Sequence, residues 1–197
     1  KKEVARKFWV NEFSYNVLPS TFIRQVGSKD DDNQFSDNYI PAQQQLELSI
    51  DETTVITHFL RYHGLTLSAL FQGVWALYWA ALDEEETVLL GMAVSGRNNS
   101  ISGIDRMLGL LTNTLPILLR IQPHKRILTW IQDIQKKQSQ ILRFEYVTVK
   151  QIAQWSRIDY NLIRRAIFHR TLVILNYPQN YVNNSMMLSC KPTEKVV

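Results

Sequence analysis

The chain has 197 residues, of which 45% are hydrophobic, 20% charged and 11% aromatic. This composition excludes pervasive disorder and predicts one compact folded unit, because the length would stretch a two-domain count. The net charge of +4 is mildly basic, but Lys and Arg are scattered in runs no longer than two, so no nucleic-acid interface is predicted. A shallow positive field could instead attract an acidic protein, although an ordinary solvated surface is the simpler interpretation.

A single cysteine, Cys190, excludes an internal disulfide framework and a thiol cluster for zinc or iron–sulfur chemistry. The first residues carry no secretory signal pattern, which together with the lone thiol favours a reducing cytoplasm. The most apolar stretch, 67–82, is too short to span a bilayer comfortably and contains Gln72, so no membrane segment is expected.

In chain order, residues 4–13 predict a short amphipathic helix that ends before Pro19. Residues 26–41 have the composition of a solvated loop, and residues 43–50 alternate polar and apolar side chains as a half-buried strand does. Asp51 is expected to cap the helix that follows.

Gly64 is expected to end that helix in a left-handed conformation, and Thr66 to cap the next one. The second helix, 67–82, is apolar almost all round and is predicted to lie inside the protein. Its aromatic residues Trp75, Tyr78 and Trp79 have the spacing of core packing rather than of a ligand stack, and 83–86 predicts a solvent-facing turn.

The continuous apolar run 87–94 predicts a strand covered on both faces. Residues 115–121 predict another strand, in which Pro116 indicates an edge or a bulge. A long helix over 127–144, a shorter helix over 149–155 and a buried strand over 171–178 complete an α/β fold class.

Few residues offer catalytic or metal chemistry. None of the four histidines, which are His58, His63, His124 and His169, has a carboxylate or cysteine at a catalytic spacing, so packing or surface roles are favoured. Gly-x-Ser-x-Gly, a Walker loop and a dinucleotide fingerprint are absent. The acidic runs 30–32 and 83–86 lack the pattern of a calcium loop, so no metal site is predicted.

One segment carries polar residues that are hard to explain by packing alone. The strand 87–94 runs into Ser95, Gly96 and Arg97, and a guanidinium at a strand end pairs best with a carboxylate. That carboxylate lies either outside the chain or at Asp105, which is nearby in sequence. Asn113 and Thr114, flanked by apolar residues, need hydrogen bonds if they are buried.

These residues resemble two core motifs of the condensation domains of nonribosomal peptide synthetases, Gly-x-x-Val-Ser-Gly-Arg at 91–97 and Gly-x-x-x-Asn-Thr-x-Pro at 109–116. Stretches 68–77, 146–156 and 168–178 are also similar, in the same order. The resemblance implies a chloramphenicol-acetyltransferase-like fold, with a mixed sheet and helices packed on it, in which two lobes enclose a tunnel. Residues 1–197 would then be a single C-terminal lobe that lacks the N-terminal lobe and the last strands and helix.

The family's catalytic motif, His-His-x-x-x-Asp-Gly, has no counterpart in this sequence, so no catalytic residue is assigned. The resemblance implies that Arg97 forms a salt bridge with the aspartate of that motif across the lobe boundary. It places Asn113 and Thr114 at the tunnel wall, where they bond backbone or substrate. Ser95 and Gly96 complete the assigned structural and tunnel residues.

The resemblance implies amide-bond formation between thioesters held on the phosphopantetheine arms of donor and acceptor carrier proteins, with an adenylation domain adjacent. The chain binds no cofactor itself and is expected to be inactive alone. An epimerisation domain or a free-standing acyltransferase of the same fold is one alternative. A noncatalytic module that binds a carrier protein or pairs with another lobe is a second alternative, and a lone lobe is expected to self-associate through its exposed apolar face.

Overall fold

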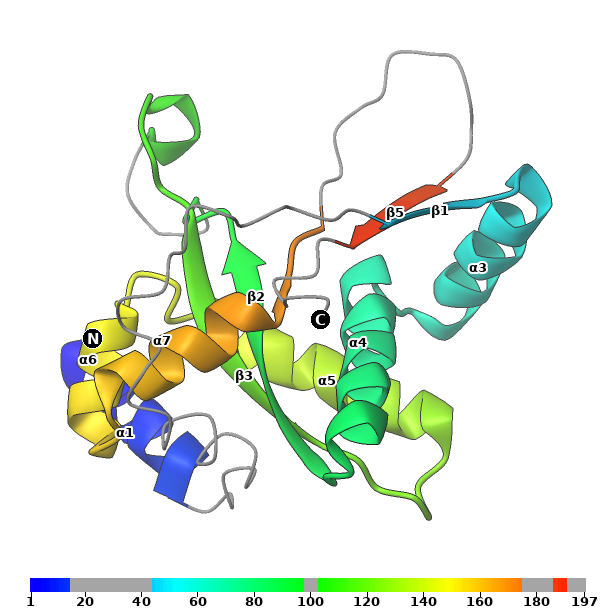
Figure 1. Ribbon diagram of the computed structural model, residues 1–197. Helices are drawn as coiled ribbons and strands as arrows, with labels where there is room; N and C mark the ends of the chain where they lie inside the picture. The colour runs from blue at the N-terminus through cyan, green and yellow to red at the C-terminus, as the bar shows by residue number, and fades with distance from the viewer. Residues whose placement is uncertain (15–43, 98–102, 175–185, 191–197) are drawn as a thin grey trace, which may run out of the picture. The chain divides into compact units, whose positions relative to one another are not determined.

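The computed structural model describes residues 1–14, 44–97, 103–174 and 186–190 (Figure 1). The predicted loop 26–41 and Pro19 therefore lie outside the described residues. The chain divides into two compact units: unit 1 comprises Lys1–Gly27 and Ser68–Ile174, and unit 2 comprises Ser28–Leu67 and Leu175–Val197. The assignment of residues 1–197 to a single lobe stays a prediction.

Unit 1 is built on a three-stranded mixed sheet with the order β3-β2-β4. The central strand β2, Thr87–Val94, is antiparallel to β3, Asn113–Arg120, and parallel to β4, Thr171–Leu172. The predicted strand 87–94 is confirmed, and five consecutive residues at its centre are buried. Pro116 lies in β3 at the edge of the sheet, as its missing N–H predicts.

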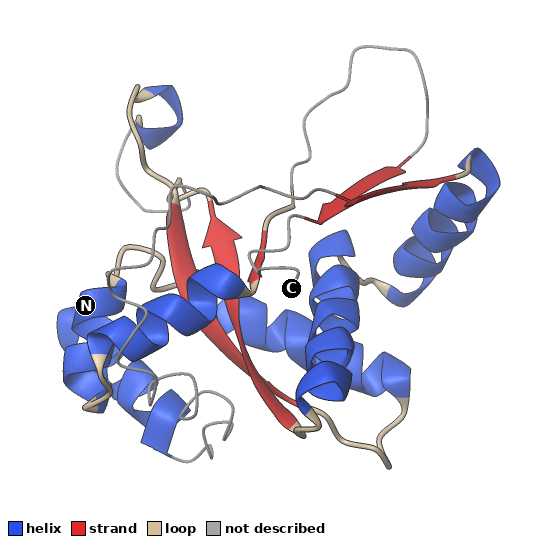
Figure 2. Ribbon diagram, in the orientation of Figure 1, coloured by secondary structure: helices blue, strands red, loops and turns tan. Residues whose placement is uncertain are grey.

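Helices cover this sheet (Figure 2), as expected for the α/β fold class. The described helices of unit 1 are α1 (Lys2–Ser14), α4 (Leu67–Asp83), α5 (Ile127–Leu142), α6 (Val149–Ser156) and α7 (Tyr160–His169), and a 3-10 helix η1, Ile104–Arg106, follows β2 in the chain. Of these, α5, α6 and α7 pack on the sheet, and α1 packs on α6. α7 packs on β2 and β3, whereas α5 packs on β3 and lies behind the sheet in Figure 1. Burial on both faces explains why β2 is apolar throughout rather than alternating.

Unit 2 contains a two-stranded antiparallel sheet and one helix. β1, Gln44–Leu48, pairs with β5, Met186–Cys190, and α3 covers Ile50–His63. The predicted cap Asp51 is wrong: Ser49 caps α3, in a capping box with Glu52. In this box the Ser49 hydroxyl accepts from the Glu52 main-chain N–H, and the Glu52 carboxylate accepts from the Ser49 main-chain N–H. The pair therefore satisfies two main-chain N–H groups, whereas a single capping aspartate would satisfy one. Gly64 ends α3 with φ of 62°, as predicted.

α4 is only partly inside the protein, which corrects the prediction of a fully buried helix. Its buried residues are mainly small: Ala69, Gln72, Gly73 and Ala76. A methyl group at Gly73 would lie 3.3 Å from Trp130 and 3.4 Å from Ile134 of α5, so the close approach of the two helices favours a small residue in α4. The bulky residues of α4 consequently point elsewhere, and Val74 and Tyr78 are each 52% exposed.

The C-terminal part of unit 1 also differs from the prediction. Helix α7, which begins after the cap Asp159 and buries Ile163, Ala166 and Ile167, was not predicted from the sequence. The predicted strand 171–178 is a strand only over Thr171–Leu172 within the described residues, and 175–178 lies outside them. No single helix in the described ranges is long and apolar enough to cross a membrane; α3 with α4, a bent pair, passes that test by length and composition only.

Candidate functional site

The segment after β2 makes a tight turn at Gly96. Gly96 has φ of 69°, and a methyl group at this position would overlap the carbonyl oxygen of Leu111. The hydroxyl oxygen of Ser95 accepts a hydrogen bond from the Arg97 main-chain N–H, 3.3 Å away. Glycine is therefore needed here for two reasons, its left-handed backbone and the close approach of the chain that returns to β3.

The Arg97 guanidinium binds the returning loop. Its Nη1 donates to the carbonyl oxygens of Ile104, at 2.7 Å, and Met107, at 3.2 Å, at the two ends of η1. The local partners are thus main-chain carbonyls rather than a carboxylate. The Asp105 side chain lies outside the described residues, so neither of the two predicted acidic partners is tested.

The loop that Arg97 holds is unusually apolar for an exposed segment. Met107 is 45% exposed, Leu108 fully exposed and Leu110 91% exposed. η1 stands beyond the ends of β2 and β3 in Figure 1. Because these leucines are not buried in unit 1, they do not stabilise its fold by hydrophobic burial. Contiguous exposed apolar side chains often mark a surface that contacts another protein.

Asn113 joins the start of β3 to the turn after α5. Its Nδ2 donates to the carbonyl oxygens of Glu145 and Val147, both at 2.9 Å, and its Oδ1 accepts from the Thr114 main-chain N–H at 2.9 Å. Glu145 and Val147 are both buried. The expected hydrogen bonding of Asn113 is confirmed, and its partners are main-chain groups.

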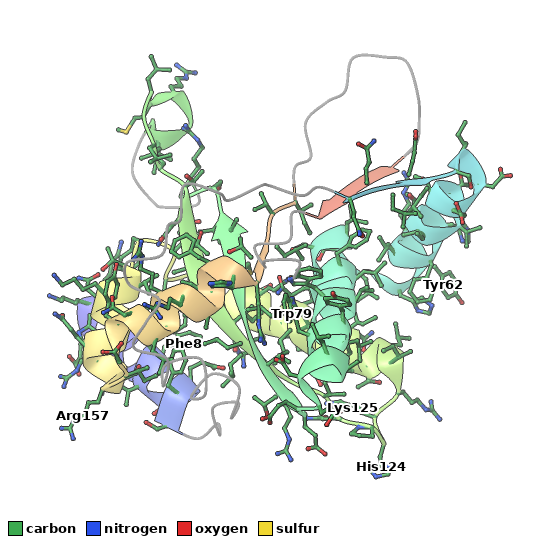
Figure 3. All side chains as sticks on the ribbon, viewed as in Figure 1. Phe8, Tyr62, Trp79, His124, Lys125 and Arg157 are labelled. Carbon is green, nitrogen blue, oxygen red and sulfur yellow. The ribbon has the colours of Figure 1, made fainter. Side chains whose placement is uncertain are left out.

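A second polar cluster was not predicted from the sequence. Arg170 and Asp83 form an ion pair, and the guanidinium carbon of Arg170 lies 4.2 Å from the ring centroid of Trp79. Trp79 is labelled beside α4 in Figure 3. The Trp75 indole donates to the Arg170 carbonyl at 3.2 Å. Asp83 is therefore not part of a solvated turn, and the two tryptophans are half-buried partners of Arg170 rather than full core residues.

The histidines have surface or packing positions, as predicted. His58, His124 and His169 are exposed, and half-buried His63 packs on Phe59 with ring centroids 4.5 Å apart. Within the described residues no group of three His, Cys, Asp or Glu side chains could hold a metal ion. The acidic run 30–32 lies outside them.

Comparison with known proteins identifies the family. Residues 1–193 match the condensation domain family. The chain belongs to that family. It is 31% identical over 179 residues to vanchrobactin synthetase VabF of Vibrio anguillarum, an alignment that covers 91% of this chain and 6% of the relative. It is 28% identical over 151 residues to gramicidin S synthase 2 of Brevibacillus brevis, covering 76% and 3%.

Solved condensation domains show the same fold. The first condensation domain of the CDA synthetase aligns with a TM-score of 0.63 and 14% identity, covering 96% of this chain and 38% of that structure. The calcium-dependent antibiotic synthetase domain with substrate analogue 2a gives a TM-score of 0.66 and 15% identity, covering 96% and 41%. The predicted α/β fold with a mixed sheet is confirmed, and the chain spans about two fifths of these structures.

Proposed function

We propose that this chain is the C-terminal lobe of a nonribosomal peptide synthetase condensation domain, whose complete form joins two carrier-tethered thioesters through an amide bond. The proposal is carried by the family match over residues 1–193, together with the segments 91–97 and 109–116, which the resemblance places in the second lobe. The chain corresponds to 38% of a solved condensation domain. Amide-bond formation is the general function of the family.

In the proposed reaction no residue of this lobe takes part in a covalent step. The acceptor amine attacks the donor thioester carbonyl, the C–N bond forms, the C–S bond breaks, and the phosphopantetheine thiol leaves as the amine loses a proton. Holding both reactants in one tunnel supplies most of the acceleration, because the encounter becomes effectively intramolecular. Proton transfer is assigned to the N-terminal lobe, because the resemblance places the histidine motif there and this sequence contains no His-His-x-x-x-Asp-Gly.

Arg97 is assigned a positioning role at the lobe boundary. Its Nη1 is used by the carbonyls of Ile104 and Met107, while Nε and Nη2 make no hydrogen bond with the described residues. A free guanidinium edge matches the two oxygens of a carboxylate. We assign that carboxylate to the aspartate of the histidine motif in the N-terminal lobe, and the exposed apolar loop at 107–110 to the same interface.

The proposed partners follow from this assignment. They are the N-terminal lobe, donor and acceptor carrier proteins with their phosphopantetheine arms, and an adjacent adenylation domain, all in a reducing cytoplasm. Ser95, Gly96, Arg97, Asn113 and Thr114 remain structural or tunnel residues in this proposal, and none is catalytic.

The test is reconstitution. The chain is incubated with loaded donor and acceptor carrier proteins, alone and with a condensation-domain N-terminal lobe that contains His-His-x-x-x-Asp-Gly, and the peptidyl product is measured by mass spectrometry. Product only in the presence of both lobes supports the proposal. Product from this chain alone at the rate of the two lobes together overturns the need for a second lobe. Carrier binding without product under both conditions overturns the catalytic assignment and favours a noncatalytic module.

Variants at Arg97 test the interface. Arg97→Ala and Arg97→Lys should lower product formation by the paired lobes about tenfold or more, because lysine cannot reproduce a two-pronged bond to a carboxylate. Arg126→Ala, which removes an exposed arginine at the start of α5, is the matched control and should leave the rate unchanged. Full activity of Arg97→Ala would remove Arg97 from the proposed interface.

A further inference from the structure

A pocket lies between α1 and α6 on unit 1, away from the loop that Arg97 holds. It has a volume of about 440 Å³ and is lined by Lys2, Glu3, Arg6, Gln154, Trp155 and Arg157. We call it the α1–α6 pocket. Its volume falls within the usual range of small-molecule sites, about 300–1,000 Å³.

The walls of the α1–α6 pocket are fixed by packing beneath them. Ala5 and Trp9 of α1 and Ile152 of α6 are fully buried, and Ala153 of α6 is only 2% exposed. The Ser156 hydroxyl donates to the Trp9 carbonyl oxygen at 3.2 Å, which joins the two helices next to the pocket. The other lining side chains therefore project from packed helices, and Arg157 follows directly as the residue that ends α6.

The pocket carries an excess of positive charge. Three cations, Lys2, Arg6 and Arg157, line it together with one carboxylate, that of Glu3, whose Oε2 lies 3.9 Å from Nη1 of Arg6. Lys2 and Arg157 form no ion pair with the described residues. Cations held within a Debye length, about 8–10 Å at moderate salt, repel one another, and a bound anion relieves that repulsion.

Arg157 occupies a backbone conformation that ordinarily belongs to glycine. It ends α6 with φ of 57° and ψ of 38°, and its N–H donates to the Ala153 carbonyl. Glu84 is the other described non-glycine residue with positive φ. Glycine would adopt this cap without strain, whereas Arg157 places a charged side chain at the end of α6, and that side chain reaches outward in Figure 3.

Trp155 adds a second kind of contact. It is half-buried and contributes an indole ring to a pocket that is otherwise polar. An indole stacks well on a planar ring, and each arginine guanidinium can donate two parallel hydrogen bonds to phosphate oxygens. We infer that the α1–α6 pocket binds a small organic phosphate carrying an aromatic ring, with its phosphate on Arg6 and Arg157 and its ring on Trp155.

The inference is independent of the proposed function and is tested by calorimetry with three probes. AMP carries both groups, ribose 5-phosphate lacks the ring, and adenosine lacks the phosphate. AMP should bind at least about tenfold more tightly than either of the others, and its binding should weaken as salt rises. Equal binding of AMP and ribose 5-phosphate overturns the role of Trp155, and tighter binding of a short polyglutamate peptide than of AMP overturns the small-molecule assignment.

Arg157→Gly separates binding from folding. Glycine keeps the left-handed cap, so the melting temperature should stay the same or rise, while AMP affinity should fall about tenfold with the loss of one charged partner. Lys7→Gln is the matched control, because it removes an exposed cation of α1 that does not line the pocket. AMP affinity that is unchanged in Arg157→Gly, or reduced equally in Lys7→Gln, overturns the site.

Discussion

The guanidinium of Arg170 and the carboxylate of Asp83 form a two-pronged ion pair between side chains that are only 7% and 9% exposed. The Arg170 carbonyl also accepts from the Gly91 N–H at 3.2 Å, which ties this pair to the centre of β2. One arginine thus connects the end of α4, the end of α7 and the central strand of the sheet.

Asp83→Ala should be strongly destabilising. Removing one partner leaves a buried guanidinium without its counter-charge, which typically costs about 3–5 kcal/mol. Urea unfolding followed by circular dichroism measures the change. Glu86→Ala is the matched control, because Glu86 pairs with Arg120 at 3.3 Å while both side chains are more than 60% exposed. That change should stay within about 0.5 kcal/mol, and equal losses in the two variants would contradict the importance of the buried pair.

Glu52 should titrate below the usual glutamate range. Two hydrogen bonds lower its pKa: the Ser49 main-chain N–H, which has the larger effect, and the Ser49 hydroxyl both donate to Oε2 at 2.8 Å. The folded-state pKa is therefore lower than the unfolded one. The capping box stabilises α3 above about pH 4.5, and this contribution is lost as pH falls through the folded pKa.

Carbon NMR of the Glu52 carboxyl group measures that pKa, and amide exchange in α3 measures its consequence. Ser49→Ala should raise the pKa part of the way toward the ordinary value, because the main-chain N–H still donates. A Glu52 pKa equal to that of an unfolded peptide, or one that Ser49→Ala leaves unmoved, would be inconsistent with the box.

The elements predicted best are those whose signal is local. β2 is an unbroken apolar run, and Gly64 stands where a left-handed cap ends α3, so neighbouring residues alone determine both. α7 was missed although Asp159 caps it, because its three buried residues are interrupted by Arg164 and Arg165. Their spacing, Ile163, Ala166 and Ile167, is the signal that could have identified the helix.

The candidate site shows the same limit. The position of Arg97 just beyond the end of β2 follows from the sequence, but its carbonyl partners depend on the path of the 103–111 loop, which no short pattern specifies. Asp83 and Arg170 are 87 residues apart in sequence and meet only because α4 and α7 end beside the same strand. From the local sequence alone, the acidic run 83–86 therefore has the pattern of a surface turn, because the partner of Asp83 is distant in the chain.

Gly96→Ala tests the tight turn before Arg97. Alanine combines positive φ with a collision against the Leu111 carbonyl, and we expect a loss of about 3 kcal/mol. Gly103→Ala is the control: Gly103 has φ of 78°, yet an added methyl group there contacts nothing within 4 Å. It should lose only about 1 kcal/mol from backbone strain. Similar losses at both positions, measured by thermal unfolding, would mean that the Leu111 contact can move aside.

Asn113→Asp is the sharpest test of the junction between β3 and the turn after α5. The carboxylate has the shape of the amide but no donor, and it would face the carbonyl oxygens of Glu145 and Val147, which Asn113 now binds at 2.9 Å. Asn113→Ala should destabilise the fold by about 2 kcal/mol through the loss of two hydrogen bonds to carbonyls of buried residues, and Asn113→Asp by more, because like partial charges then oppose each other. Thr114→Val should change stability by less than about 0.5 kcal/mol, because the Thr114 hydroxyl makes no hydrogen bond with the described residues. If Asn113→Asp proved as stable as the parent chain, the two carbonyls would have to be satisfied by water, and Asn113 would not join these elements.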